Sequence, residues 1–527
     1  MPRYFPDLET FTTRAADFDV VPVYRQLLAD HLTPVTAFEV LGRDEYAFLL
    51  ESVVGGEKLG RYSFIATAPA LLYQATAGRA SIRALTAIPY FARNSDFNTT
   101  DPLNDLAKLL PPRRYYHDKN LPAFTGGLVG YAGYDTARYY ESEKLTHAPA
   151  DDRKLPDLQF GLYGELVVFD HVDKTIKVIA NAIVKRVGSR ESEGAGRSAG
   201  VGSQQAGDGS QHAFVDCYNN ACLRIDAIVR RLQQPPRSTL GEIDHKQPLS
   251  LKFDSNFTRD AFESAIARGQ EYIKAGDIFQ FVPSQRLRVH SPADPFDVYR
   301  ALRVVNPSPF MFYLKSPECT LIGSSPEILC RVQDRVMTSR PLAGTRPRGA
   351  TTEEDARLEA ELLADPKERA EHIMLVDLHR NDIGRVAEIG SVVVSESMSV
   401  ERYSHVMHIT TNVHGTLRSD MTAMDALRVS LPVGTVSGAP KIRAMQIIDE
   451  LEPTRRGPYG GGVGYLDFAG NMDTCIALRT IVWKNGVFDV QAGAGVVADS
   501  IPSSEYDETM NKAKAMLKAV EIAQRGF

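Results

Sequence analysis

The chain has 527 residues, and its 60 Lys and Arg residues against 66 Asp and Glu residues leave a formal net charge of −6. Hydrophobic residues make up 43% and charged residues 24% of the chain, which excludes a chain disordered throughout, a collagen-like array and a coiled-coil rod. No apolar run approaches the roughly 18 residues of a membrane span, and the first residues carry neither a signal nor a transit pattern, so we expect a cytoplasmic protein. The acidic balance disfavours a broad nucleic-acid surface, which needs clustered Lys and Arg.

The first half of the chain combines strand patterns with one unusual insertion. Residues 164–170 and 175–180 flank a short turn, and the second run alternates with period two, which predicts a β-hairpin. Residues 188–212 are rich in Gly, Ser, Gln and Ala and carry almost no large apolar side chain, so we expect a flexible insertion. Apolar residues then recur at helical spacing over 214–232, and a polar joint with prolines follows over 233–247.

The second half opens with a helix and a strand. Thr258 is the expected N-cap of the helix, and Gly276 is its expected stop. Residues 277–289 predict one continuous strand, in which Gln280 lies on the face opposite Phe279 and Phe281.

Glu371 is a carboxylate in an apolar position. In the helix predicted over 367–378, Met374, Leu375 and Leu378 follow it at i+3, i+4 and i+7, so Glu371 is expected at the centre of the apolar stripe. A carboxylate buried there is costly unless it is paired or bound to a cation. An internal ion pair with Arg380 and a metal site explain this pattern equally well.

The terminal helix, predicted over 504–525, carries Glu505, Glu508 and Lys512 on one face. Three carboxylates from two helices, these two with Glu371, suit Mg²⁺, which prefers oxygen ligands. Taken alone, an acid-and-lysine face is more often a solvated surface, and spacing does not show that the two helices converge.

Glycine clusters over 457–464 and 492–495, next to strand-like segments. Glycine lets backbone N–H groups approach an anion, but bends in a sheet explain these clusters better because neither is a Walker loop. The cysteines are odd in number and scattered, so we expect them to be reduced: Cys217, Cys222, Cys319, Cys330 and Cys475.

A series of ordered motifs covers nearly the full chain. They are Asp277-Ile-Phe-Gln280 with Val282-Pro-Ser284, Ile322-Gly-Ser-Ser-Pro-Glu327, Arg340-Pro-Leu-Ala-Gly-Thr345, Glu371-His372, Gly434-Thr-Val-Ser-Gly-Ala-Pro-Lys441, Arg456-Gly-Pro-Tyr-Gly460, Ala477-Leu-Arg479 and Ala492-Gly-Ala-Gly495. With these motifs the chain resembles component I of anthranilate synthase, the large subunit that uses chorismate.

The resemblance implies an α+β fold in which antiparallel sheets pack on one another and helices flank them. It divides the chain into an N-terminal regulatory region over 1–187, the insertion over 188–212, a helix and linker over 213–255, and a catalytic region over 256–527. It also implies the reaction, in which ammonia adds to chorismate, the 4-hydroxyl leaves and pyruvate is eliminated to give anthranilate in tryptophan biosynthesis.

The resemblance also assigns roles to residues of the catalytic region. Mg²⁺ is expected on Glu371 and Glu508, with Glu505 nearby. Chorismate is expected to contact Gly344, Thr345, Tyr459, Arg479, Gly493, Gly495 and Lys512, and Thr435 lines the ring end. Glu327 matches the residue that protonates the leaving hydroxyl, which requires a raised pKa. His408 matches an assisting histidine, with a buried structural histidine as the alternative role and His405 as the competing residue.

Two positions separate the relatives. Enzymes that add water carry a lysine base where this chain has Gln280, and glutamine cannot take a proton from water. Aminodeoxychorismate synthases carry a lysine at the position of Ala343, which offers no nucleophile. Both positions favour an enzyme that receives ammonia.

The N-terminal region resembles the family's feedback region for L-tryptophan. The matching segments are Leu49-Leu-Glu-Ser52 and Asn306-Pro-Ser-Pro-Phe-Met311, so that Ser52, Lys58, Pro309, Phe310 and Met311 are the expected tryptophan contacts. Phe310 departs from the tyrosine of enteric members, and the spacing from Ser52 to Lys58 is shorter than theirs. No glutamine amidotransferase half is recognised, so we expect a separate glutaminase subunit as partner. The alternatives are an aminodeoxychorismate synthase component I and a catalytically silent tryptophan sensor.

Overall fold

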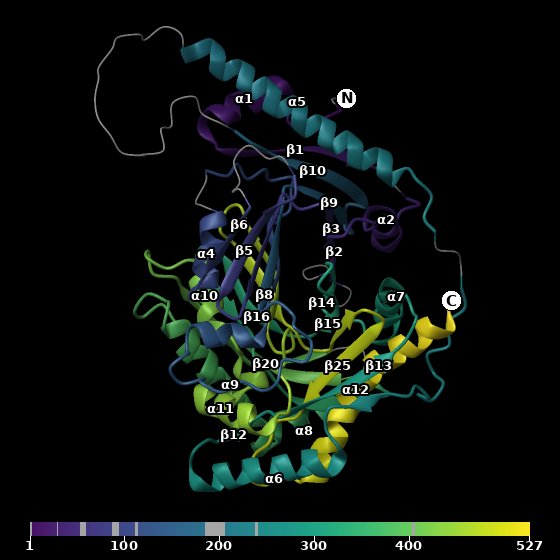
Figure 1. Ribbon diagram of the computed structural model, residues 1–527, viewed down its shortest axis with the longest axis vertical. Helices are drawn as coiled ribbons and strands as arrows, with labels where there is room; N and C mark the ends of the chain where they lie inside the picture. Colours follow the sequence, from purple (N-terminus) through teal and green to yellow (C-terminus); the bar gives the residue numbers. More distant parts are fainter. Residues whose placement is uncertain are drawn as a thin grey trace.

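The computed structural model describes residues 3–28, 30–52, 60–86, 94–110, 114–184, 206–237, 241–402 and 406–527, with the side chains of 206–210 excepted. Within these ranges the strands form two large antiparallel sheets that pack on one another, with helices on their outer faces (Figure 1). The α+β architecture implied by the resemblance is therefore confirmed. No described helix is long and apolar enough to cross a membrane.

The first sheet holds eleven of the described strands. In spatial order they are β1 (Val20–Leu27), β10 (Thr175–Ile183), β9 (Glu165–Asp170), β3 (Tyr62–Thr67), β2 (Ala47–Glu51), β14 (Phe310–Lys315), β15 (Thr320–Ser325), β24 (Thr480–Lys484), β25 (Val487–Gly493), β13 (Ser284–His290) and β11 (Asp254–Ser255). The hairpin expected from the sequence is β9 and β10, which pair antiparallel.

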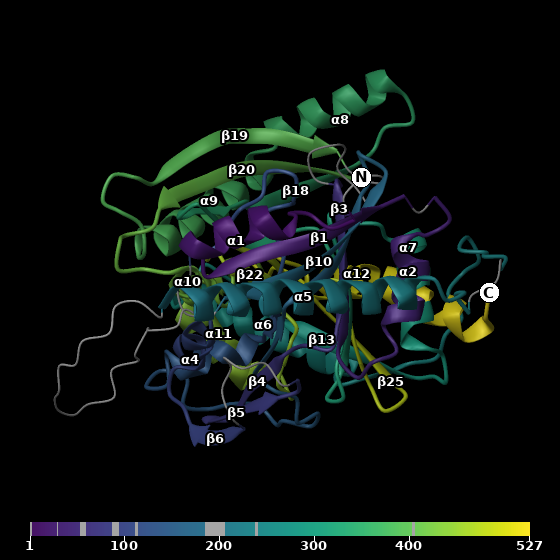
Figure 2. The same cartoon turned by 90° about the horizontal axis from the view of Figure 1, so that it is seen from above.

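The second sheet follows the order β18 (Leu342–Pro347), β20 (Val406–Thr416), β17 (Val336–Ser339), β16 (Ile328–Gln333), β23 (Met472–Ile476), β22 (Gly462–Asp467), β7 (Gly127–Ala132), β8 (Leu158–Tyr163), β4 (Leu71–Thr76), β5 (Arg79–Ala84) and β6 (Ser95–Asn98). Strand β19 (Val393–Arg402) pairs only with β20 among the described strands and lies with α8 (Thr352–Ala364) on one side of the molecule (Figure 2). Strands from both expected regions, 1–187 and 256–527, thus contribute to both sheets.

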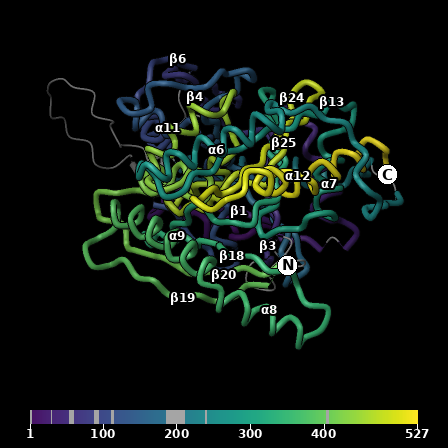
Figure 3. Tube along the Cα trace, turned by 90° about the horizontal axis from the view of Figure 1, so that it is seen from below, coloured from purple at the N-terminus to yellow at the C-terminus, as the bar shows by residue number. Residues whose placement is uncertain are grey.

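The helices are α1 (Leu8–Asp17), α2 (Pro34–Leu41), α4 (Pro102–Leu109), α5 (Ala206–Leu232), α6 (Arg259–Ala275), α7 (Pro295–Val305), α8 (Thr352–Ala364), α9 (Pro366–Gly384), α10 (Ala423–Ser430), α11 (Lys441–Leu451) and α12 (Pro502–Arg525), with 3₁₀ turns η1 (Tyr134–Tyr139) and η2 (Gly434–Val436). Helix α6 has the expected caps, because the Thr258 hydroxyl accepts from the N–H of Ala261 and Gly276 adopts φ +84°. Helix α12 packs against α6 and α7 (Figure 3).

Two expectations on secondary structure need correction. The end of the expected insertion, residues 206–212, forms the first turns of α5, and residues 188–205 lie outside the described residues. The single strand expected over 277–289 is broken into β12 (Gln280–Phe281) and β13 at Pro283, which has no N–H to donate to a ladder. Strand β12 pairs instead with β21 (Gly438–Ala439). Phe279 is 73% exposed, so the expected alternation of faces also fails.

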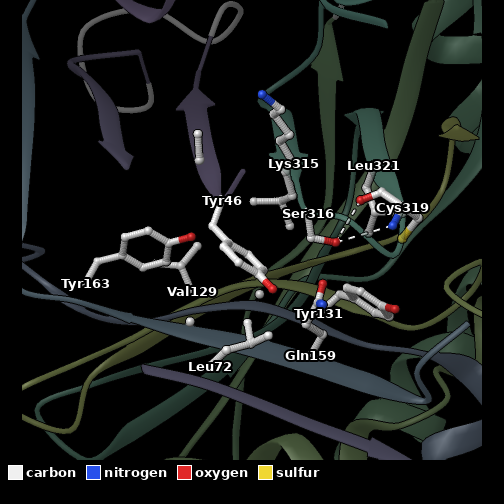
Figure 4. A pocket seen from close by; sticks show the side chains of 14 residues that line it. Tyr46, Leu72, Val129, Tyr131, Gln159, Tyr163, Lys315, Ser316, Cys319 and Leu321 are labelled. Atoms are coloured by element: carbon white, nitrogen blue, oxygen red, sulfur yellow. Dashed lines mark hydrogen bonds between the residues drawn. The ribbon is translucent and has the colours of Figure 1, made fainter. Parts of the chain in front are cut away.

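Close packing joins the two sheets. Phe48 of the first sheet contacts Tyr163 of the second with their rings at 88°, and Phe312 and Val463 belong to one buried cluster. A cavity of about 30 Å³ lies where Tyr46, Leu72, Val129 and Gln159 meet (Figure 4). This volume suits a water molecule and is too small for an organic ligand. All five cysteines are free thiols, as expected.

Candidate active site

Glu327 lies in the turn between β15 and β16 and is 3% exposed. Its Oε1 accepts a hydrogen bond of 3.0 Å from the hydroxyl of Thr435 in η2. Burial raises the pKa of Glu327 to about 8, against the opposing effects of Thr435 and the Leu342 N–H. The carboxyl group is therefore protonated near neutral pH, which meets the condition for a general acid.

His408 lies half-buried on β20, beside the irregularity of strand β18 at Gly344, which has φ +66°. Its Nδ1 is 2.8 Å from the carbonyl oxygen of Gly344 and 3.1 Å from the hydroxyl of Thr345. Because a carbonyl only accepts, Nδ1 carries the proton and Nε2 carries the lone pair of the neutral ring. Burial lowers the pKa of His408, and the charge of Arg479 lowers it further. His405, the competing residue, lies outside the described residues.

Arg479 precedes β24 and adopts a left-handed backbone with φ +48°, which is strained for a residue other than glycine. Its guanidinium is half-buried and makes no hydrogen bond or ion pair with any residue that the structure describes. Burial lowers the pKa of Arg479, and the phenol of Tyr459 and the carboxylate of Glu508 oppose that effect. A half-buried cation without a partner is costly, so this position is suited to an anionic ligand.

Next to Arg479, contacts join Tyr459, Gly493 and Lys512 to one another. A Cβ on Gly493 would lie 2.8 Å from the Pro283 carbonyl oxygen and 3.1 Å from the Tyr459 hydroxyl, so the backbone there fits only glycine. The Lys512 ammonium on α12 donates to the carbonyl of Gly493 at 3.0 Å and pairs with Glu508 Oε1 at 2.6 Å. The second glycine cluster therefore lies against the charged face of the terminal helix.

Glu371, Glu505 and Glu508 bring negative charge together from α9 and α12. Burial, followed by the charges of Glu368 and Glu508, raises the pKa of Glu371. The pKa of Glu505 is likewise raised, first by burial and then, against the lowering hydrogen bond of Ser500, by the charge of Glu508. Glu371 of α9 is near enough to Glu508 of α12, and Glu505 of α12 near enough to Lys367 of α9, for the charge of the second residue to shift the pKa of the first, which the spacing alone did not show.

A hard divalent cation fits this cluster under one condition. Within the described ranges, no three Asp, Glu, His or Cys side chains lie close enough to enclose a metal. Two carboxylates that repel one another can still hold Mg²⁺ when a ligand carboxylate and water complete its oxygen shell. Glu508 would then exchange its contact with Lys512 for one with the cation.

Two sequence interpretations of Glu371 are wrong. Arg380 pairs with Asp377 at 2.8 Å, so it does not neutralise Glu371. The buried stripe of α9 also runs along other positions, namely His372, Leu375, His379, Asp382 and Ile383. Glu371 lies half-buried at the flank of that stripe, where its carboxylate can face the terminal helix.

Gln280 and Ala343 are both buried. A Cβ on Gly495 would lie 2.7 Å from Nε2 of Gln280, so this side chain packs directly on the second glycine cluster, while its Oε1 has no partner in the described structure. Ala343 is 8% exposed and pairs with Ile409 of β20, one residue from His408.

A second site lies between the sheets. A pocket of about 370 Å³ is lined by Ser52, Pro309, Phe310 and Met311, together with residues of β16, β22 and β23. The hydroxyl of Ser52 is buried there without a hydrogen-bond partner in the described structure. Four of the five residues expected to bind tryptophan therefore share one pocket, and the fifth, Lys58, lies outside the described residues.

Comparison with known proteins identifies the family. The family model for the chorismate binding enzyme matches residues 49–518, which is most of the chain. The chain belongs to the chorismate-binding enzyme family. The anthranilate synthase component 1 of Acetivibrio thermocellus is 44% identical over 523 residues, covering 99% of each chain. That of Pseudomonas aeruginosa is 44% identical over 520 residues, covering 98% of this chain and 99% of the relative.

A solved structure agrees with this assignment. Anthranilate synthase component I from Streptococcus pneumoniae superposes with a TM-score of 0.72 at 37% identity, covering 88% of this chain and 94% of that one. Within the chorismate-binding enzymes the chain therefore belongs with the component 1 group.

The sequence motifs of this chorismate-binding enzyme did not assign every residue that the site depends on. Glu51, in the segment expected to contact tryptophan, accepts hydrogen bonds from Tyr299 at 2.6 Å and from Nη2 of Arg303 in α7 at 3.1 Å. Ser324 bonds to the backbone of Arg479, and Arg456 is fully enclosed beside Tyr459. These contacts join segments far apart in sequence, so no local pattern signals them.

Proposed function

We propose that this chain converts chorismate and ammonia into anthranilate, pyruvate and water, with Mg²⁺ bound and L-tryptophan as inhibitor. The unpaired guanidinium of Arg479, close enough to Glu508 of α12 for that carboxylate to affect its pKa, is the observation that carries this proposal. Chorismate has two carboxylates, so a site with the Arg479 guanidinium at one end and a bound Mg²⁺ at the other would match this dianion. The names of the relatives support the same reaction.

The two carboxylates of chorismate are assigned to different groups. Arg479 would hold the enolpyruvyl carboxylate through its planar fork, with the hydroxyl of Tyr459 and the amide of Gly495 as further donors. Glu371 and Glu508 would hold Mg²⁺, with Glu505 beside them, and the ion would neutralise the ring carboxylate when bound. Lys512 adds positive charge at the ring end, next to Gly493.

Glu327 and His408 supply the proton chemistry. Ammonia adds to the ring carbon next to the one that bears the carboxylate, both ring double bonds shift, the C4–O bond breaks and the hydroxyl leaves as water with the proton of Glu327. The ammonium group that forms then loses a proton, which balances the one that Glu327 gave up. Thr435 keeps the Glu327 carboxyl group oriented through its hydrogen bond. In the second step a ring proton and pyruvate leave, and His408, whose Nε2 carries the lone pair, assists the proton transfer.

Ammonia is the proposed nucleophile because the side chains at two positions provide no other. Gln280 cannot act as a base towards water, and Ala343 cannot attack the ring. The relatives are named as component 1 of anthranilate synthase, which supports a partner subunit for this chain. We propose a glutaminase that supplies ammonia as that partner.

L-Tryptophan is the proposed ligand of the pocket between the sheets. The pocket volume of about 370 Å³ accommodates an indole and its amino-acid group, and its lining combines Pro309, Phe310 and Met311 with the unpaired hydroxyl of Ser52. The lining strand β14 pairs with β15, which leads directly to Glu327. A ligand in this pocket can therefore influence the catalytic acid across one strand.

A fluorescence assay for anthranilate tests the proposal, with chorismate, Mg²⁺ and ammonium at alkaline pH. Formation of anthranilate and pyruvate in equal amounts is expected. Formation of 4-amino-4-deoxychorismate would favour an aminodeoxychorismate synthase, which the alanine at position 343 disfavours. Absence of turnover together with tryptophan binding would favour a silent sensor, which the complete set of Glu327, Arg479 and Glu508 disfavours.

A further inference from the structure

Arg456 is a buried arginine whose bonds reach several parts of the active site. It is 2% exposed, and its Nη1 donates to the carbonyl of Val436 at 2.6 Å while its Nη2 donates to the carbonyl of Val282 at 2.6 Å. Its Nε donates to Glu452 Oε2 at 3.0 Å, and Nη2 also bonds to Glu452 Oε1. One guanidinium therefore joins η2, the break between β12 and β13, and the end of α11.

Glu452 extends the same network. Its Oε1 accepts the backbone N–H of Ser284 at 2.7 Å and the Ser284 hydroxyl at 2.9 Å. The Ser284 hydroxyl in turn accepts from Gln491 Nε2 of β25 at 2.8 Å. The carboxylate thereby fixes the start of β13 against the strand that ends in Gly493.

Two tyrosine rings enclose the guanidinium. The Cζ of Arg456 lies 4.6 Å from the ring centroid of Tyr134 and 5.8 Å from that of Tyr459. Such contacts stabilise a cation over an aromatic face, so Arg456 also sets the position of Tyr459.

Two of the segments that Arg456 holds carry a residue of the proposed site, and one of the two rings against it belongs to such a residue. Val436 follows Thr435, the hydrogen-bond donor to Glu327. Val282 lies two residues after Gln280, and Tyr459 is a proposed donor to the substrate. A buried ion pair contributes little net stability compared with apolar packing, so stability alone does not account for this network.

We propose that Arg456 and Glu452 form a positioning pair that sets Thr435, Gln280 and Tyr459 relative to one another, a role that rests on the proposed function. Only arginine suits it, because five N–H groups in one plane reach two carbonyls and a carboxylate together. A lysine at position 456 keeps the charge beside Glu452 but cannot make all of these bonds.

Arg456→Lys tests the pair through the pH profile of kcat. If η2 shifts, Thr435 loses its bond to Glu327, and because that bond lowers the pKa of Glu327, the pKa rises. We therefore expect kcat to fall at least about tenfold and the alkaline limb of its profile to move to higher pH, as in Thr435→Val. The double variant should show no further displacement, since both changes remove the same hydrogen bond.

Arg138→Lys is the matched control. Arg138 is a half-buried arginine that pairs with a carboxylate of α11, Asp449, at 2.6 Å, and none of its bonds reaches η2 or β12. Arg138→Lys should lower the melting temperature without displacing the alkaline limb of the kcat profile. If Thr435→Val fails to displace the limb, the role of Glu327 in the proposed function is wrong. If Thr435→Val displaces it and Arg456→Lys does not, the positioning pair is wrong.

A gentler variant covers the case in which Arg456→Lys does not fold. Ser284→Ala removes only the hydroxyl that bonds to Glu452 and Gln491. It should lower kcat severalfold with a smaller displacement of the limb in the same direction. An unchanged kcat and an unchanged pH profile in this folded variant would overturn the proposal.

Discussion

The backbone N–H of Ser324 donates a hydrogen bond of 3.1 Å to the carbonyl oxygen of Arg479. The Ser324 hydroxyl also accepts from Asn306 Nδ2 at 3.0 Å, and Ser324 pairs in register with Met311 of β14. Strand β15 therefore lies between the strand that lines the proposed tryptophan pocket and the strand that follows Arg479. Any shift of β14 reaches the strained backbone of Arg479 through one residue.

Because of this link, we expect Ser324→Ala to weaken the coupling between tryptophan binding and chorismate binding. The variant keeps the backbone N–H to Arg479 but loses the bonds to Asn306, so tryptophan should still bind while its effect on chorismate affinity falls at least about fivefold. Calorimetric titration of each ligand with and without the other measures the coupling, which must be equal in both directions.

Ser316→Ala is the control for that experiment, because its hydroxyl caps the turn at the opposite end of the β14–β15 hairpin, accepting the Cys319 N–H and donating to the Cys319 carbonyl at 2.9 Å. It should leave the coupling unchanged. Equal coupling in wild type and Ser324→Ala would show that the two sites communicate by another route.

The sequence predicted those parts of the fold that depend on local patterns. The caps of α6, the extent of α12 and the β9–β10 hairpin follow from spacing and capping residues alone. The break at Pro283 was missed because the alternating pattern continues through the proline. Besides the missing N–H of Pro283, non-local contacts stabilise the break, since Arg456 takes the Val282 carbonyl and β21 takes the place of a neighbouring strand.

In the candidate site, too, some features follow from local sequence patterns and others depend on tertiary contacts. Spacing placed Glu505, Glu508 and Lys512 on one face, but the convergence of that face on Glu371 depends on how α9 and α12 are packed. The polar groups that support the site, such as Glu452 and Ser324, are ordinary in sequence. Their roles follow from tertiary contacts that join residues far apart in the chain.

Arg479 predicts a conflict between stability and function. Arg479→Gly should stabilise the protein by about 1 kcal/mol, because it removes a side chain from a left-handed backbone and a half-buried unpaired cation, and it should lose chorismate binding. Thermal unfolding and chorismate titration measure the two effects. Asn485→Gly, at a φ of +50° in the turn between β24 and β25, is the control that relieves similar strain and should keep chorismate binding. A lower melting temperature in Arg479→Gly would contradict the expectation.

Arg479→Lys separates the geometry of the guanidinium from its charge. Lysine keeps the positive charge but loses the bidentate fork, so the KM for chorismate should rise roughly 10-fold to 100-fold, in line with the loss of one or two charge-assisted hydrogen bonds. Steady-state kinetics at saturating Mg²⁺ and ammonium measure this ratio. An unchanged KM would place the enolpyruvyl carboxylate elsewhere.

A substitution at Glu508 tests how turnover depends on Mg²⁺. Glu508→Gln removes one of the two carboxylates proposed to hold Mg²⁺, so turnover should be lost at ordinary Mg²⁺ and partly recovered at much higher concentration. Activity measured across a Mg²⁺ series gives the result. Asp507→Asn is the control, since Asp507 is exposed on the same helix and pairs with Arg259 at 3.2 Å. Wild-type activity of Glu508→Gln at ordinary Mg²⁺ would refute its role as a ligand.

A substitution at Ser52 tests where the inhibitor tryptophan binds. Ser52→Arg puts a long charged side chain into the pocket of about 370 Å³, so the tryptophan concentration for half-inhibition should rise at least about tenfold. Inhibition curves at fixed chorismate measure the effect, with Thr76→Arg, an exposed residue at the end of β4, as control. Equal inhibition of Ser52→Arg and wild type would count against this pocket.

Glu327 predicts how activity depends on pH. Its pKa is raised from an ordinary 4.5 to about 8, so the carboxyl group holds its proton at neutral pH and loses it as the pH rises through about 8. Because only the protonated acid can convert the leaving hydroxide into water, kcat should fall above that pH. The measurement needs saturating ammonia at every pH, since the fraction of free ammonia itself rises with pH. Glu327→Gln should lower kcat by about 10² to 10⁴ and should abolish the alkaline fall, since glutamine has no proton to lose. An alkaline limb that persists in Glu327→Gln would assign it to another group, and the general acid would have to be sought elsewhere.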